Sequence, residues 1–184
     1  MFSGIMKKGI IALIGMIVAL VFIIVAFFGS WYTGTQAGAS GNFYLTKFET
    51  SGVTVEYSSP LLVGIDLKSI FDNTMYLTIG ALVTAILALI GILGFVFNFG
   101  KPNTMRMLGF IFGIITFVLA LVATLYFMTA FPGKIPGYTE FWNKDLGPGY
   151  AWYLMLVAAI IALIASIAML LKKSAPELVA QPLQ

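Results

Sequence analysis

The chain has 184 residues, of which 60% are hydrophobic and only 9% are charged, with a formal net charge of +3. Soluble domains carry about a quarter charged residues, so this composition predicts an integral membrane protein whose surface largely meets lipid. The sequence contains neither Cys nor His, which excludes disulfides, thiolate or imidazole metal sites, a Cys nucleophile and a His general base.

Four stretches are long and apolar enough to cross a membrane as helices, since a span takes about 20 such residues. They cover residues 9–29, 75–97, 107–130 and 150–171. Lipid leaves no backbone polar group unpaired, and the sequence lacks the alternating ten-residue segments of a membrane β-barrel. We therefore predict an all-α membrane fold, a four-transmembrane-helix bundle that forms one domain over residues 1–184.

The distribution of charge predicts the orientation of the spans. Six of the ten basic residues flank the spans on one side of the membrane: Lys7, Lys8, Lys101, Arg106, Lys172 and Lys173. Six of the seven acids lie in segments 30–74 and 131–149. The positive-inside rule then places both termini, including the tail 172–184, in the cytoplasm and these two segments outside. We expect a multi-pass protein of the plasma (cell) membrane.

The first outer segment, 30–74, is too long for a simple connection. Residues 42–49 and 53–57 alternate β-branched or aromatic with polar side chains around a short turn that contains glycine, which predicts a β hairpin. A third short strand fits at 61–65. An isolated hairpin is marginal in water, so we expect a small extracellular antiparallel hairpin or sheet that leans on the helix ends. Three prolines and four glycines in the second outer segment, 131–149, predict turns instead of regular structure.

The spans carry no Asp, Glu, Lys or Arg, and charged residues within the membrane are the usual mark of transport paths and proton relays. Motifs for phosphate binding, metalloprotease or serine-hydrolase chemistry are missing from the sequence. We therefore expect no enzyme, no cofactor, no metal site and no small-molecule substrate, and the basic balance reflects topology, not a nucleic-acid partner. We expect the hydroxyl groups inside the spans to bond to the preceding helical turn: Thr84, Thr116, Thr124 and Ser166. We expect Asp72, Asn73 or Thr74 to cap the second span.

Small residues recur in the spans at the intervals that allow close helix packing. The candidates are Gly80, Thr84, Ala88 and Gly91 in the second span, Gly109 and Gly113 in the third, and Ala158, Ala162, Ala165 and Ala168 in the fourth. These stripes could close the bundle within one chain or hold a neighbouring subunit. The sequence leaves both readings open.

All Trp and Tyr residues fall in the outer segments or at the outer helix ends. Amphipathic rings favour the membrane interface, so an interfacial belt with folded outer segments is one explanation. The other is a contact surface for another membrane protein or a second copy of the chain. Trp31, Tyr57, Trp142 and Tyr150 are the candidate contacts.

Four spans, cytoplasmic termini, a long first outer segment with a β hairpin and a shorter second one make a layout that resembles the claudin and peripheral-myelin-protein type of tetraspan protein. Trp31, just after the first span, loosely echoes the aromatic start of the first outer segment in that family. The family's Gly-Leu-Trp and its two cysteines are missing from this chain. The resemblance therefore implies an architecture and carries over no functional residue.

The first functional hypothesis is a non-enzymatic tetraspan protein that acts in lateral assembly, adhesion or regulation of other membrane proteins through its outer domain. Its partners would be the lipid bilayer and another membrane protein or itself. The second hypothesis is a small accessory subunit of a larger membrane enzyme or transport complex. A pore formed by oligomers is a third.

Overall fold

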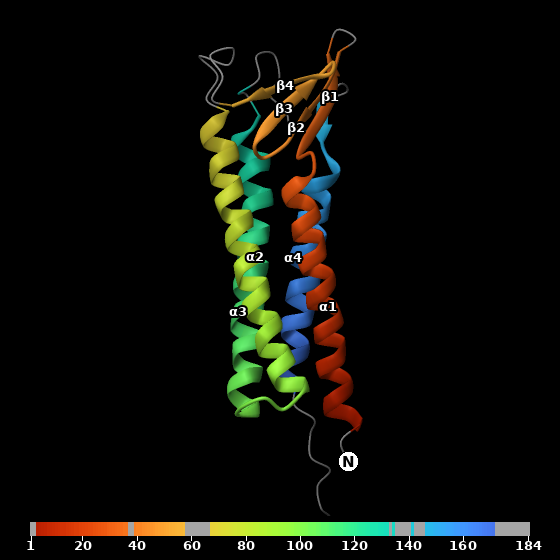
Figure 1. Cartoon of the computed structure of the whole chain (residues 1–184), viewed down its shortest axis with the longest axis vertical. Helices are drawn as coiled ribbons and strands as arrows, with labels where there is room; N and C mark the ends of the chain where they lie inside the picture. The colour runs from red at the N-terminus through yellow and green to blue at the C-terminus, as the bar shows by residue number, and fades with distance from the viewer. Residues whose placement is uncertain are drawn as a thin grey trace, which may run out of the picture.

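The structure, a computed structural model, describes residues 3–36, 39–57, 67–132, 134, 141 and 146–171. Its four long helices are α1 (Ser3–Phe28), α2 (Lys68–Val96), α3 (Pro102–Ala130) and α4 (Tyr150–Leu170). They run up and down side by side, and a small sheet covers one end of the bundle (Figure 1). All four are long and apolar enough to cross a membrane, which confirms the prediction of four spans. We call the two ends of the bundle the sheet end and the loop end, the latter holding the turn between α2 and α3, residues 97–101.

Helix α2 begins seven residues earlier than predicted, at Lys68. The predicted capping residues therefore lie inside the helix and do not cap it. Lys68 pairs with Asp72 one turn later, and the hydroxyl of Thr74 donates to the carbonyl oxygen of Ile70 at 2.8 Å. Charged residues end the apolar run in the sequence, but an exposed Lys–Asp pair four residues apart is compatible with a helix and stabilises it slightly.

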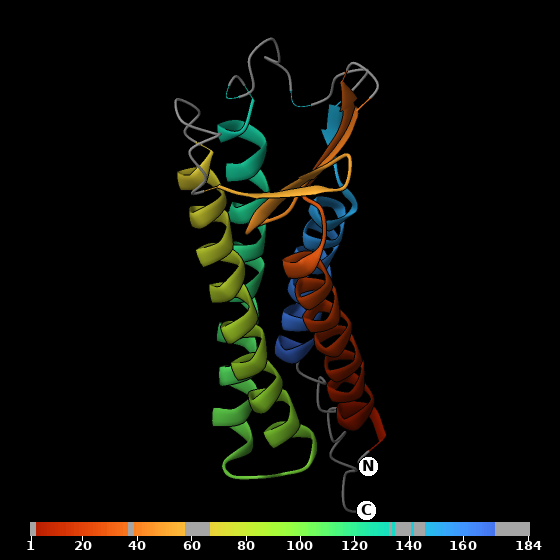
Figure 2. The same cartoon turned by 45° about the horizontal axis from the view of Figure 1, so that its top comes forward.

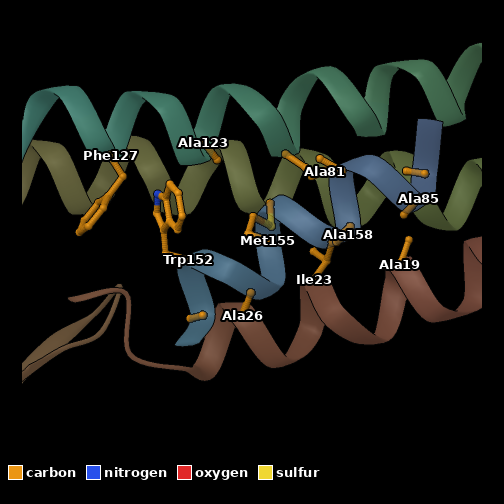
Figure 3. Packing of buried hydrophobic residues seen from close by; sticks show 14 of the residues in the cluster. Ala19, Ile23, Ala26, Ala81, Ala85, Ala123, Phe127, Trp152, Met155 and Ala158 are labelled. Atoms are coloured by element: carbon orange, nitrogen blue, oxygen red, sulfur yellow. The ribbon is translucent and has the colours of Figure 1, made fainter. Parts of the chain in front are cut away.

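Each helix turns a row of buried side chains, most of them small, toward the bundle axis. The rows are Ala12, Met16, Ala19, Ile23 and Ala26 on α1; Phe71, Thr74, Thr78, Ala81, Ala85, Ala88 and Ile92 on α2; Gly109, Gly113, Thr116, Ala120, Ala123 and Phe127 on α3; and Ala151, Met155, Ala158, Ala162, Ala165 and Met169 on α4. The alternating spacing of three and four residues is the seven-residue repeat of left-handed helix packing. Figure 3 shows Ala81, Ala85 and Ala158 from these rows in the space between the helices. Larger apolar side chains such as Ile14 and Ile164 face outward, where lipid would cover them.

Glycines set the distance between neighbouring helices. A Cβ added to Gly91 of α2 would lie 2.9 Å from the Cα atom of Gly109 in α3, which is closer than real Cβ atoms approach backbone. A Cβ added to Gly113 of α3 would collide with the hydroxyl of Ser166 in α4. The candidate packing residues Gly109, Gly113, Ala158, Ala162 and Ala165 are all buried within the chain. Their burial supports packing within one bundle over contact with a neighbouring subunit.

The stripe predicted on α2 contacts α3. Gly80 lies against Leu119. The single hydroxyl proton of Thr116 is shared between the hydroxyl oxygen of Thr84, at 3.0 Å, and the carbonyl oxygen of Phe112, at 2.8 Å. The predicted bonds of the buried hydroxyl groups to the preceding helical turn are present for Thr84, Thr116, Thr124 and Ser166.

The sheet has five antiparallel strands in the order β4-β3-β2-β1-β5, larger than the predicted hairpin. The strands are β1 (Tyr32–Gln36), β2 (Ala39–Phe43), β3 (Lys47–Thr50), β4 (Val53–Glu56) and β5 (Leu146–Pro148). The predicted strand at 53–57 corresponds to β4. The predicted strand at 42–49 is wrong, because a turn at residues 44–46 divides it between β2 and β3. The candidate strand at 61–65 lies outside the described residues.

Two features explain why the strands pair in this order. Ser51 and Gly52, both at positive φ, form the two-residue turn between β3 and β4, a geometry that matches the twist of a hairpin. Strand β5 comes from the second outer segment and pairs with β1, Pro148 lying opposite Tyr32. Proline is tolerated there because β5 is an edge strand. The two outer segments are therefore joined in one sheet.

Candidate functional site

A continuous cluster of aromatic rings fixes the sheet to the bundle. This aromatic cluster consists of Trp31, Tyr32, Phe43, Phe48, Tyr57, Phe71, Phe127, Phe131, Phe141 and Trp152. It links three strands with α2, α3 and α4, and Figure 3 shows Phe127 and Trp152 at the sheet end of the core. Each ring pair adds about 0.5–1.5 kcal/mol beyond the area it buries. The sheet is therefore held firmly on the helices.

Buried polar tips of the cluster are hydrogen-bonded to backbone. The indole N–H of Trp31 donates to the carbonyl oxygen of Ala26 at 2.9 Å, in the last turn of α1. The indole N–H of Trp152 donates to the carbonyl oxygen of Thr124 at 3.1 Å. These bonds satisfy groups that would be costly to bury unpaired, and the first one folds Trp31 back onto its own helix.

Tyr57 holds the turn between β2 and β3 against α2. Its hydroxyl group lies 2.7 Å from the carbonyl oxygen of Tyr44 and 2.9 Å from that of Lys47, with its proton shared between them. Its ring stacks on Phe71 with centroids 4.2 Å apart. Burial raises the pKa of Tyr57 well above the usual tyrosine range, because the phenolate would be desolvated.

The structure places the four candidate contact residues in different environments. Trp31 is fully buried, so it offers no surface and the expectation of a partner contact there does not fit the structure. Tyr57 is half-buried and belongs to the aromatic cluster. Trp142 lies outside the described residues. Tyr150, the first residue of α4, is 55% exposed and is the candidate with an accessible ring.

Tyr150 lies near a half-buried group of mixed chemistry at the β2–β3 turn and in β3. We define the Tyr150 patch as Tyr44, Lys47, Glu49 and Tyr150, of which Tyr150 is the exposed member. Lys47 and Glu49 form an ion pair at 2.5 Å, and the ammonium group of Lys47 lies 5.3 Å from the centroid of the Tyr44 ring. The ring of Tyr150 covers Gly29, where an added Cβ would lie 2.7 Å from Cε2 of the tyrosine. Exposed tyrosine rings are enriched at protein contact surfaces, whereas Lys and Glu are depleted in the centre of such surfaces.

The pKa values of Tyr44, Lys47 and Glu49 depend on one another. Burial, followed by the negative charge of Glu49 and a smaller effect of Tyr150, raises the pKa of Tyr44. The hydrogen bond from Lys47 lowers the pKa of Glu49 and raises that of Lys47. The sequence predicts Tyr44 inside a strand. It does not predict the turn at 44–46 in which this residue lies, so Tyr44 is not among the predicted contact residues.

Strand β4, which ends the sheet among the described strands, is a second feature at this end. Among the described strands, β4 pairs with β3 alone and ends the sheet. Val53 on this strand is exposed. An edge strand with unpaired backbone groups can accept a strand from a partner.

A shallow groove of about 400 Å³ runs between α2 and α3 near the sheet end. Its lining residues are Asn73, Tyr76, Leu77, Leu119 and Tyr126. The amide of Asn73 donates to the hydroxyl of Tyr126 at 2.9 Å, so the polar groups lie toward the sheet end. Within the part of the chain that the structure describes, no three metal-ligating side chains cluster.

In comparisons with known proteins, no family model matches this chain and no curated protein matches it significantly. The resemblance to claudin-type tetraspan proteins thus stays a prediction based on layout.

Proposed function

We propose that this multi-pass membrane protein is not an enzyme and acts in lateral assembly, adhesion or regulation of other membrane proteins through its sheet end. The observation that carries the proposal is the exposed ring of Tyr150 in the Tyr150 patch, whose other members are half-buried, next to a sheet that ten aromatic rings fix to the bundle. A surface on a firmly held scaffold loses little conformational entropy when it binds.

Charge supports an orientation with the sheet end outside the cell. Each carboxylate that the structure describes belongs to the sheet or to the first turns of α2: Glu49, Glu56 and Asp72. Lys101 and Arg106 lie at the loop end. By the positive-inside rule the loop end faces the cytoplasm, and we propose the plasma membrane as the location.

The accessory-subunit hypothesis has its own supporting observation. Most residues of the small-residue stripes are buried inside the chain, which favours packing within one bundle over contact with a neighbouring subunit: Ala88, Gly91, Gly109, Gly113, Ala158, Ala162 and Ala165. The groove between α2 and α3 does face outward, with Tyr76 64% exposed beside it. A helix of a larger complex would meet the protein there, not at the Tyr150 patch.

A pull-down from native membranes in mild detergent separates the two proposals. The variants are Tyr150→Ala and Tyr76→Ala, which remove the same side chain from two exposed positions near the same end of the bundle. If the sheet-end proposal holds, Tyr150→Ala loses the co-purifying protein or second copy and Tyr76→Ala retains it. Loss with Tyr76→Ala alone, together with a stoichiometric enzyme or transporter in the wild-type sample, supports the accessory subunit. Equal capture by both variants contradicts both proposals.

A further inference from the structure

The turn at the loop end has a preformed geometry. Asn98 and Gly100 both adopt positive φ, and the amide of Phe99 donates to the carbonyl oxygen of Gly94 at 2.8 Å. The side chain of Met105 fills the space beside both glycines, and its Sδ lies 2.7 Å from the position of a Cβ on Gly94. The turn therefore presents its outer side chains from a fixed backbone.

These outer side chains combine apolar rings with cations. Phe97 and Phe99 are 58% and 69% exposed, with ring centroids 6.1 Å apart. Lys101 is exposed, and Arg106 follows one turn into α3. The Nε atom of Arg106 is buried without a hydrogen-bond partner among the described residues. Because this Nε atom has almost no accessible surface, a ligand from outside can reach only the terminal nitrogens of the guanidinium group.

The described part of the chain supplies no negative charge at the loop end, because its three carboxylates lie at the sheet end. Helix α1 begins at this same end, and Figure 2 shows its first turns near the α2–α3 turn. Among the described side chains, Lys101 and Arg106 make the loop end basic. Charge complementarity calls for an anion from the bilayer leaflet at this end.

We propose that Arg106 and Lys101 bind the headgroup phosphate of an anionic phospholipid in the leaflet at the loop end. The guanidinium group suits a phosphate because it offers parallel N–H donors to two oxygens. The rings of Phe97 and Phe99 then lie in the boundary between headgroups and acyl chains, where exposed apolar side chains next to basic ones are stabilised. This site is independent of any protein bound at the sheet end.

The test uses the full chain in lipid nanodiscs made of phosphatidylcholine with or without phosphatidylglycerol, and native mass spectrometry counts the retained lipids. The wild type is expected to retain phosphatidylglycerol in preference to phosphatidylcholine. Each basic residue near an anionic surface contributes about 1 kcal/mol, so the Lys101→Gln/Arg106→Gln variant is expected to weaken this preference about thirtyfold. The matched control, Lys68→Gln/Lys134→Gln, removes the same charge at the sheet end and is expected to keep the preference.

Four outcomes overturn the proposal, the last of them in a measurement of salt dependence. The wild type could show no preference. The loop-end variant could retain as much phosphatidylglycerol as the wild type, or the control could lose as much as the loop-end variant. If the loop-end variant does not fold, the wild type is measured at low and at high salt instead. Salt screens exposed charges, so high salt is expected to abolish the preference for phosphatidylglycerol. A preference unchanged by salt contradicts the proposal.

Discussion

The close approach of α2 and α3 at Gly91 gives the sharpest test of the helix packing. In a Gly91→Ala variant the new Cβ would lie 2.9 Å from the Cα atom of Gly109 and 3.0 Å from the carbonyl carbon of Leu108, whereas ordinary contacts begin at 3.4 Å. Both obstacles are backbone atoms, so no side chain can rotate away. The backbone nitrogen of Gly109 would lie closer still, so the two helices must separate by about 1 Å, and a gap of that size removes about half of the dispersion energy at each affected contact.

Gly80→Ala is the matched control, since it makes the same substitution on the same helix toward the same neighbour. Its new Cβ would meet only Cδ1 of Leu119, at 3.2 Å, and that side chain can shift. Both variants gain about 1 kcal/mol of helix propensity, which cancels in the comparison. Overpacking costs about 1–3 kcal/mol, so we expect Gly91→Ala to be less stable than Gly80→Ala by that amount.

The assay is equilibrium unfolding in mixed micelles of a mild detergent and dodecyl sulfate, followed by tryptophan fluorescence. Both variants are measured at the same total detergent concentration. If their free energies of unfolding agree within about 0.5 kcal/mol, a typical error of additive comparisons, then the helices do not meet at Gly91 as described.

Three further predictions concern the aromatic cluster and the helix contact. Trp31→Ala is expected to lower the free energy of unfolding by about 3–5 kcal/mol, because it removes a fully buried ring and leaves a cavity; a near-neutral value in the same unfolding assay would show that the indole is not buried. Tyr57 is neutral in the folded state while an unfolded tyrosine ionises near pH 10, so the stability that its burial confers is present below about pH 10 and is lost as pH rises further. Comparing the slope of stability against pH with that of Tyr57→Phe checks this, and identical slopes would contradict it. Thr116→Val removes the hydrogen bond to Thr84 between α3 and α2 and is expected to cost about 0.6 kcal/mol, a typical value inside a bilayer; a loss above about 2 kcal/mol would show a larger role for this pair.

The sequence predicted the spans well, because hydropathy over 20 residues is a strong local signal. It misplaced the start of α2, since Lys68 and Asp72 interrupt the apolar run although their pairing supports the helix. The spacing of small residues predicts the packing stripes. Which neighbouring helix each stripe faces depends on how all four helices pack together. Gly80 and Thr84 contact α3, while Ala81 and Ala85 line the axis.

The sheet is harder to predict from the sequence than the helices, because part of its strand pairing joins distant segments of the chain. Strand β1 has the sequence Tyr-Thr-Gly-Thr-Gln, which shows no alternation of apolar and polar residues. Its outer neighbour β5 is three residues long, ends in a proline and lies more than a hundred residues away in the sequence. Period-two patterns detect strands with one buried face, and neither strand has such a pattern.

Two of the candidate contact residues, Trp31 and Tyr150, lie in different environments, the first buried and the second exposed. Trp31 and Tyr150 are both aromatic residues next to the sheet end of a helix, and nothing in the sequence distinguishes them. The side chain of Trp31 turns back to bond to Ala26 and is buried in the core. Tyr150 begins α4 with its ring over Gly29 and stays exposed. The contacts that each ring makes, not residue type, separate a core residue from a surface residue here.

Cross-linking in intact membranes tests the central claim most directly, namely that the chain meets its protein partner at the Tyr150 patch. A photoreactive phenylalanine analogue replaces Tyr150 in one sample and Tyr76 in the other, and both are irradiated before any detergent is added. The account predicts a defined cross-linked protein, or a second copy of this chain, from position 150 and none from position 76. A protein adduct from position 76 with only lipid adducts from position 150 would contradict it.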